Sequence, residues 1–273
     1  MHFVEFGSGT PILMIHGLCV DHRLLLGLDP VLAARGTWRR IYLDLPGMGR
    51  SVAGPQIRSS DAVAEAVVDF VRENLGGQHF AVLGNSFGGM LARHLVAEFG
   101  HRVMGLGLLC PVVVAEKSRR TLPPRRILHA DPHLLASLDP ADATDYAELA
   151  VIQSRGNWER FRDCALPGLR AFDRRAVGRI AGNYPLAVEP EDRVSSFGGP
   201  VLLIAGRQDH VVGFEDQLAL AGRYGNCTVS VLEEAGHNAH LDQPGQTGAL
   251  LDGWLADMED IRRPGAAGAH RAP

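Results

Sequence analysis

The segment His79–Ala92 constrains this chain more than any other stretch. An apolar run ends at Leu83, the turn Gly84–Gly88 follows with Ser86 at its centre, and an apolar helical pattern begins at once. When a strand turns this sharply into a helix, a serine at the turn is held in a strained conformation with its hydroxyl exposed. Glycines fit on either side because strand and helix approach closely there. We therefore expect Ser86 to stand in a nucleophile elbow.

Short apolar runs alternate with helical patterns on both sides of this turn. Apart from the run before Ser86, strands are expected at Phe3–Phe6, Ile12–Ile15, Trp38–Leu43, Val103–Cys110, Val201–Ala205 and Thr228–Leu232. Helices are expected at Asp29–Arg35, at Phe214–Tyr224, at Gln246–Met258, and from an N-cap at Ser60 or Asp61 to about Leu75. Uninterrupted apolar strands separated by helices are typical of a parallel sheet that is covered on both faces. The pattern predicts an α/β fold with a mostly parallel sheet flanked by helices.

The alternation stops in the middle of the chain. Between Pro111 and Phe197 no buried strand is evident, and helical patterns occur around Tyr146–Gln153, Trp158–Ala165 and Arg174–Asn183. We interpret residues 112–197 as a mostly helical insertion into a core formed by residues 1–111 and 198–261. Residues 262–273 are rich in Gly, Ala and Pro, and we expect them to be a disordered tail.

Composition excludes several classes of protein. The net charge of −4 gives no reason to expect nucleic acid or an anionic membrane as a partner. No apolar run approaches the length of a membrane span, and the first residues lack a signal-peptide pattern, so we expect a cytoplasmic location. A homodimer is left open. The cysteines have no metal-type spacing, so we expect free thiols and no metal at Cys19, Cys110, Cys164 and Cys227.

Two further residues can complete a catalytic site around Ser86. A serine hydroxyl needs a base within hydrogen-bond reach, and that base needs an orienting carboxylate. Asp209 and His237 each lie in a loop that follows a predicted strand, and the carboxyl ends of parallel strands meet at one edge of a sheet. His210 and His240 are alternative bases. Asp209 could instead cap the following helix, and Ser86 could be a turn serine without chemistry.

Taken together, the chain resembles the α/β-hydrolase family over nearly its whole length. The matching motifs are His16-Gly17, Asp44-x-x-Gly47-x-Gly49-x-Ser51, Gly84–Gly89, Gly206–Asp209 with Val211, and Gly236-His237 followed by Asp242-x-Pro244. The resemblance implies that the helical insertion is the cap domain of that family.

The resemblance also assigns roles to single residues. Ser86 would be the nucleophile, His237 the general base and then general acid, and Asp209 the group that orients His237. The backbone N–H groups of Leu18 and Phe87 would form the oxyanion hole. His16 would shape the loop of the oxyanion hole. Asp44 and Ser51 would stabilise the loop in which they themselves lie, Asp44–Ser51. Neither a metal nor an organic cofactor is implied, because this chemistry needs neither.

A serine at the elbow indicates acyl transfer through an acyl-enzyme, followed by hydrolysis. The expected substrate is a small to medium, largely apolar carboxylic ester, or a thioester or lactone. By analogy with the family, the substrate would bind between core and cap. We expect Cys19, Val112, Tyr146, Trp158 and Phe161 to contact it.

Two alternatives stay open. The elbow also resembles that of hydrolases that cleave carbon–carbon bonds in ring-fission products. Those enzymes usually carry a tryptophan after the catalytic histidine, where this chain has Asn238, and the segment Leu18–His22 also differs from theirs. The second alternative is a ligand-binding protein of the same fold that retains the three residues without turnover.

Overall fold

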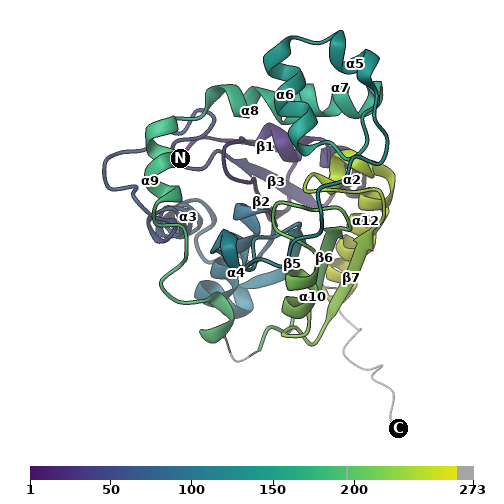
Figure 1. The fold of residues 1–273 in the computed structure, drawn as a ribbon. Helices are drawn as coiled ribbons and strands as arrows, with labels where there is room; N and C mark the ends of the chain where they lie inside the picture. The colour runs from purple at the N-terminus through teal and green to yellow at the C-terminus, as the bar shows by residue number, and fades with distance from the viewer. Residues whose placement is uncertain (195, 263–273) are drawn as a thin grey trace.

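A single seven-stranded sheet organises the structure, a computed structural model that describes residues 1–194 and 196–262 (Figure 1). The strands are β1 (Phe3–Phe6), β2 (Thr10–Ile15), β3 (Trp38–Leu43), β4 (Phe80–Asn85), β5 (Val103–Leu109), β6 (Val201–Gly206) and β7 (Cys227–Leu232). Their order in the sheet is β1-β3-β2-β4-β5-β6-β7. β1 runs antiparallel to β3, and every other pair of neighbours is parallel. The predicted α/β fold with a mostly parallel sheet is confirmed.

Helices connect the strands and cover the sheet. Those before β5 are α1 (Arg23–Leu26), α2 (Asp29–Arg35), α3 (Ser60–Leu75) and α4 (Phe87–Phe99), with the short 3-10 helix η1 (Gly100–Arg102). Those between β5 and β6 are η2 (Lys117–Arg119), α5 (Pro132–Ala136), α6 (Pro140–Leu149), α7 (Arg155–Cys164), α8 (Leu166–Ala171), α9 (Arg174–Ala181) and η3 (Pro190–Asp192). The last are α10 (Glu215–Ala221), α11 (Ala239–Asp242) and α12 (Pro244–Arg262).

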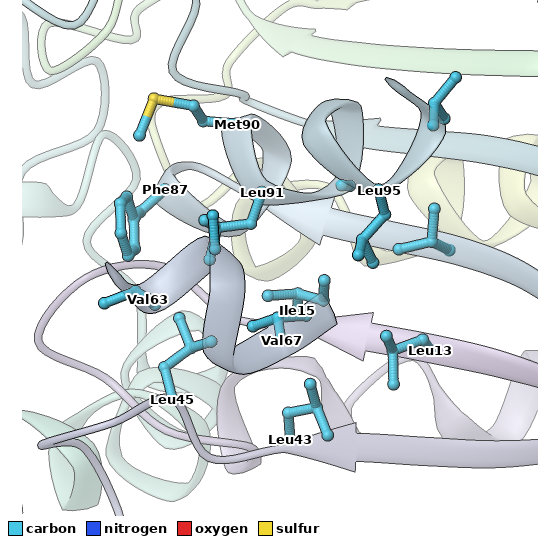
Figure 2. Packing of buried hydrophobic residues seen from close by; sticks show 14 of the residues in the cluster. Leu13, Ile15, Leu43, Leu45, Val63, Val67, Phe87, Met90, Leu91 and Leu95 are labelled. Carbon is cyan, nitrogen blue, oxygen red and sulfur yellow. The ribbon is translucent and has the colours of Figure 1, made fainter. Parts of the chain in front are cut away.

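Strands β2, β4 and β6 are buried along nearly their whole length. Successive side chains of a strand point to opposite faces of the sheet, so such a strand packs against a core on each face. Leu13 and Ile15 of β2 pack in the cluster that holds the apolar side chains of α3 and α4 (Figure 2). Ile12 and Met14 of the same strand pack in the cluster formed with α2 and α12. One short strand therefore contributes to both halves of the core.

Helix α3 shows how local sequence sets an element. The side chain of Ser59 accepts a hydrogen bond from the Ala62 N–H at 3.2 Å and caps the helix. We had expected Ser60 or Asp61 at this position. Ser60 is instead the first helical residue, and its hydroxyl donates to the carbonyl of Tyr184 at 2.6 Å. The cap of α3 and its contact to a distant loop thus come from adjacent serines.

The segment between β5 and β6 is helical, as the sequence indicates. In its described part the only β pairing is an isolated bridge between His129 and Ile152. Figure 1 places α5, α6 and α7 together on one side of the molecule. The carbonyl of Asn183, just after α9, accepts a hydrogen bond at 3.1 Å from the N–H of Ser60, which begins α3. The domain limits at 111/112 and 197/198 stay a prediction. Of the predicted disordered tail, Arg262 ends α12, and residues 263–273 lie outside the described residues.

Among the described helices, none combines the length and apolar character needed to cross a membrane.

Candidate active site

Ser86 stands at the junction between β4 and α4 with a strained backbone. Its φ of 53° and ψ of −116° lie where non-glycine residues are rare. A Cβ atom on Gly84 would overlap the carbonyl oxygen of Gly88, and one on Gly88 would overlap that of Ile15. The two glycines are therefore required by close backbone approach, as expected for an elbow.

Three side chains from different loops meet at this turn. His237 Nε2 lies 2.9 Å from the Ser86 hydroxyl, and His237 Nδ1 lies 2.9 Å from Oδ2 of Asp209. Ser86 is 7% exposed, His237 9% and Asp209 0%. With its proton on Nδ1, the imidazole donates to Asp209 and can accept the serine hydroxyl proton at Nε2. The three residues predicted from the sequence are thus brought together in hydrogen-bond contact.

The carboxylate of Asp209 is itself fixed by backbone groups. Its Oδ1 accepts hydrogen bonds from the N–H groups of Val211 at 2.9 Å and Val212 at 3.0 Å, while Oδ2 faces His237. The alternative that Asp209 caps the following helix is wrong, because α10 begins at Glu215 with Phe214 as its N-cap residue and without a side-chain cap. One oxygen holds the loop, and the other orients the imidazole.

The alternative bases lie elsewhere. His240 is buried and donates from Nε2 to the Leu24 carbonyl at 3.1 Å, and burial lowers its pKa to about 4. Burial also lowers the pKa of His210. In the described part of the chain, the histidine in hydrogen-bond contact with Ser86 is His237.

The proposed oxyanion groups lie beside the serine. Phe87 is the first residue of α4, and N–H groups in the first turn of a helix have no acceptor within that helix. Leu18 borders the same cavity as Ser86, and a Cβ on the adjacent Gly17 would lie 3.2 Å from Ser86 Cβ. The loop that contains Gly17 and Leu18 therefore touches the elbow.

His16 fixes this loop, as its resemblance to the family motif implied. Its Nδ1 donates to the Gly17 carbonyl at 2.6 Å, and its Nε2 accepts from the Leu45 N–H at 3.0 Å. Burial is the main reason that its pKa is lowered, although the Gly17 carbonyl acts in the opposite direction. A neutral imidazole with a hydrogen bond at each ring nitrogen suits a structural role.

A cavity of about 680 Å³ opens above Ser86 and His237. Leu18, Cys19 and Val112 border it, as predicted. Its walls also include Leu149, Leu169 and Tyr184, which the sequence alone did not single out.

Three predicted contact residues do not line this cavity. Tyr146, Trp158 and Phe161 pack on one another with ring centroids 5.3 to 6.1 Å apart, inside a separate apolar cluster. The helices α6 and α7 need a core of their own, and their aromatic rings supply it. The expectation that these three residues contact substrate is therefore corrected.

Tyr184 is the aromatic residue that does reach the cavity. Its ring stacks on that of Phe87, with centroids 5.4 Å apart and an interplanar angle of 28°. In the sequence it is a single aromatic residue in a loop after α9, and no periodic pattern marks it. Only the fold places it next to the elbow.

Charged residues surround part of the cavity. Glu116, Lys117, Arg120, Asp145 and Glu148 all contribute to its lining. From the sequence alone, the pair Arg119-Arg120 indicates a solvated face rather than an anion site. Arg120 instead donates to the carbonyls of Val114, Ala115 and Val211 at 2.8 to 3.1 Å. It therefore ties the chain after β5 to the loop after β6.

The loop that carries His237 is attached to helix α7. Asp242 accepts hydrogen bonds from the Gly236 N–H and from Asn157 Nδ2, both at 2.8 Å. Arg160 donates to the Leu241 carbonyl at 2.7 Å. Burial raises the pKa of Asp242 to about 6, while the hydrogen bonds from Gly236 and Asn157 lower it. Helix α7 thus contacts the loop next to the base.

Comparison with known proteins places this geometry in a family. Residues 10–244 match the α/β hydrolase fold family. The chain belongs to this family. A solved α/β superfamily hydrolase from Oenococcus oeni superposes with a TM-score of 0.87 at 29% identity, covering 94% of this chain and 96% of that one.

Two curated relatives cover most of this α/β hydrolase. A pimeloyl-acyl-carrier-protein methyl ester esterase from Aeromonas hydrophila is 27% identical, covering 89% of this chain and 94% of that protein. A dihydrolipoyllysine-residue acetyltransferase component of an acetoin cleaving system from Cupriavidus necator is 27% identical over 90% of this chain. The chain spans only 63% of the length of that acetyltransferase component. An esterase and a monoacylglycerol lipase among the curated relatives agree with the prediction of a carboxylic-ester-hydrolase-like enzyme.

Proposed function

We propose that this α/β hydrolase is a serine esterase that acts through an acyl-enzyme. Its substrates would be small to medium, largely apolar carboxylic esters, with thioesters and lactones as chemically equivalent variants. The observation that carries the proposal is the hydrogen-bonded series Ser86–His237–Asp209 at the base of the cavity, with both contacts at 2.9 Å.

Acylation follows from the positions of these atoms. Ser86 Oγ attacks the ester carbonyl carbon while its proton passes to His237 Nε2. The N–H groups of Leu18 and Phe87 bind the oxyanion of the tetrahedral intermediate, and losing one such donor typically costs about 3 kcal/mol. Collapse of the intermediate breaks the ester C–O bond, and the leaving alkoxide takes the proton from His237.

Deacylation repeats the steps with water. His237 removes a proton from a water molecule that attacks the acyl carbon, and then returns that proton to Ser86 as the acid leaves. Asp209 stays ionised and stabilises the imidazolium at each transfer. No step needs a metal or an organic cofactor.

Three observations support the substrate class. The cavity of about 680 Å³ lies within the usual range of about 300 to 1,000 Å³ for small-molecule sites. Leu18, Val112 and Leu169 give it an apolar wall beside Ser86. A relative that is matched over 94% of its length is described as a methyl ester esterase, which supports a carboxylic ester.

Steady-state hydrolysis of p-nitrophenyl acetate and butyrate tests the proposal. Ser86→Ala, His237→Ala and Asp209→Asn should each lower kcat by about 10⁴-fold or more, since each removes a group that acts in the same transition state. His210→Ala is the matched control next to Asp209, and it should stay within a few-fold of wild type. Full activity of Asp209→Asn would require another acid.

A folded wild type without ester turnover would redirect the search. Ring-fission products with a scissile carbon–carbon bond would be assayed next, because they use the same nucleophile and base. Tight ligand binding without turnover of either class would instead support a binding protein.

A further inference from the structure

A second cluster of ionisable side chains lies outside the candidate active site. His2 precedes β1, His22 precedes α1, and Asp44 directly follows β3. The Nδ1 atom of His2 lies 2.7 Å from Oδ2 of Asp44, and the Nδ1 atom of His22 lies 2.8 Å from Oδ1. The two nitrogens and the carboxylate lie within 4.8 Å of one another. Three segments that are distant in sequence therefore present three metal-ligating groups to one point.

The carboxylate in this cluster is held independently of the two imidazoles. Asp44 is fully buried, and its two oxygens accept hydrogen bonds from the backbone N–H groups of His22 and Arg50, both at 3.0 Å. Gly49, at a φ of 55°, packs so closely that a Cβ there would overlap the carboxylate. Asp44 would keep its orientation if both imidazoles bound something else.

We propose that this cluster binds a divalent cation of borderline hardness, with Zn²⁺ as the representative ion. The ligands are Nδ1 of His2, Nδ1 of His22 and one carboxylate oxygen of Asp44. Two imidazoles and one carboxylate form a donor set that suits Zn²⁺ and leaves a fourth position for water.

Binding of the ion would replace the present partners of the two imidazoles. Each Nδ1 atom now faces an oxygen of Asp44, and as a metal ligand it carries no proton, so the ring proton of the bound form lies on Nε2. The carboxylate loses two N–H donors and gains the cation. Side-chain exposures of 27% for His2 and 12% for His22 leave a path for the ion from solvent.

The expected role of this site is stabilisation. The ion would join the residue before β1 to the loop that begins at Gly17 and Leu18 and ends at His22. It would bind the folded chain, in which the three ligands meet, and so raise the stability of that state. None of the three residues belongs to the series of Ser86, His237 and Asp209, so ester hydrolysis should not require the ion.

Calorimetric titration of chelator-treated protein with Zn²⁺ tests the proposal. Wild type should bind one ion per chain, and the ion should raise the melting temperature. His2→Ala and His22→Ala should each weaken binding by about tenfold or more, because each removes one of three protein ligands. A variant with weakened Zn²⁺ binding should also show a smaller Zn²⁺-induced rise in melting temperature.

A second histidine pair provides the matched control. His79 and His101 are exposed and have ring centroids 6.0 Å apart, close to the 5.8 Å between His2 and His22. In the described chain no third ligand joins them. The double variant His79→Ala/His101→Ala should bind Zn²⁺ as wild type does.

Co²⁺ provides a readout of the ligands themselves. Bound Co²⁺ should give visible ligand-field bands without the near-ultraviolet charge-transfer band of a thiolate ligand. If His22→Ala does not fold, the comparison rests on His2→Ala, whose side chain lies near the chain end. The proposal is overturned by absent saturable binding, by unchanged affinity in His2→Ala, or by a thiolate band that assigns the ion to a cysteine.

Discussion

At the scale of single residues, the strained turn at Ser86 depends on glycines that no other residue can replace. Gly88 lies in the first turn of α4, and its Cα faces the carbonyl of Ile15. Replacing glycine by alanine inside a helix ordinarily stabilises it. At Gly88 the overlap with the Ile15 carbonyl would instead destabilise the fold, so the two effects on stability oppose each other.

Gly88→Ala should lower the free energy of unfolding by about 3 kcal/mol, because the added methyl group must displace the backbone of β2. Urea denaturation measures the change. Gly253→Ala in α12 is the matched control, since a Cβ there meets no atom within 4 Å. The control should gain about 0.5 to 1 kcal/mol from helix propensity. Equal effects in both variants would contradict the close approach at the elbow.

His240 links burial to pH dependence. Its Nδ1 is buried without a hydrogen-bond partner, and burial lowers its pKa from 6.5 to about 4. Above pH 6.5, the pKa of histidine in the unfolded chain, His240 is neutral in both states and its burial does not reduce the free energy of unfolding. Stability is lost as the pH falls towards 4, because the unfolded chain binds the proton more tightly.

His240→Gln should therefore make the protein more resistant to acid. Glutamine can still donate to the Leu24 carbonyl, and it does not titrate. Relative to wild type, the free energy of unfolding of the variant should rise by about 2 kcal/mol between pH 7 and pH 5. Asp242 titrates in both proteins, so its contribution cancels in the difference. Denaturation curves of both proteins at pH 7 and pH 5 give their free energies of unfolding. If the difference between variant and wild type is the same at both pH values, the lowered pKa of His240 is contradicted.

At the scale of elements, helix α7 supports the loop that carries the base. Asn157 donates both to Asp242 and to the Leu241 carbonyl, at 2.8 and 3.2 Å. Because Asp242 also accepts a hydrogen bond from the Gly236 N–H, a side chain of α7 is connected to the residue before His237.

Asn157→Ala should destabilise the fold by about 1 to 3 kcal/mol, because it leaves a buried carboxylate with one donor fewer. It should also lower kcat for ester hydrolysis several-fold, since the loop of His237 loses its contact with α7. Arg162→Ala on the same helix removes only an exposed pair with Asp163 and should change neither quantity. A variant that is destabilised but has unchanged kcat would show that the contact does not position the base.

The same scale separates what the sequence predicts well from what it does not. β6 matches its predicted limits to within one residue at its end, because an uninterrupted apolar run in a buried parallel sheet has few other interpretations. β1 and β3 also match their predicted limits, although β1 is a partly exposed antiparallel edge strand and β3 contains Arg39 and Arg40. Between β5 and β6, α5 and α8 were not anticipated, since helices of five and six residues carry too little periodicity. Helix limits also shifted: α10 ends at Ala221, three residues before its predicted end.

The candidate site divides in a similar way. Ser86, Asp209 and His237 could be found because each lies in a short motif after a strand. Part of the cavity wall could not, because the directions of Tyr146 and Trp158 are set by packing between α6 and α7. Tyr184 was missed for the same reason, since its place beside Phe87 is a tertiary contact.

At the scale of the whole molecule, two sets of groups lie at loops that the sheet brings together from distant parts of the chain. One set contains Ser86, His237 and Asp209, and opens into the cavity. The other contains His2, His22 and Asp44 and lies at the far end of the loop that starts beside Ser86. The two sets share no residue, so substitutions can change the proposed ester hydrolysis and the proposed cation binding separately.

The reactivity of Ser86 tests the central claim most directly. A fluorophosphonate, which reacts with a serine activated by a neighbouring base, should label the folded wild type at one site per chain. Peptide mapping should place the label on Ser86, and Ser86→Ala should remain unlabelled. A folded wild type in which Ser86 stays unmodified, or in which another residue carries the label, would contradict the account.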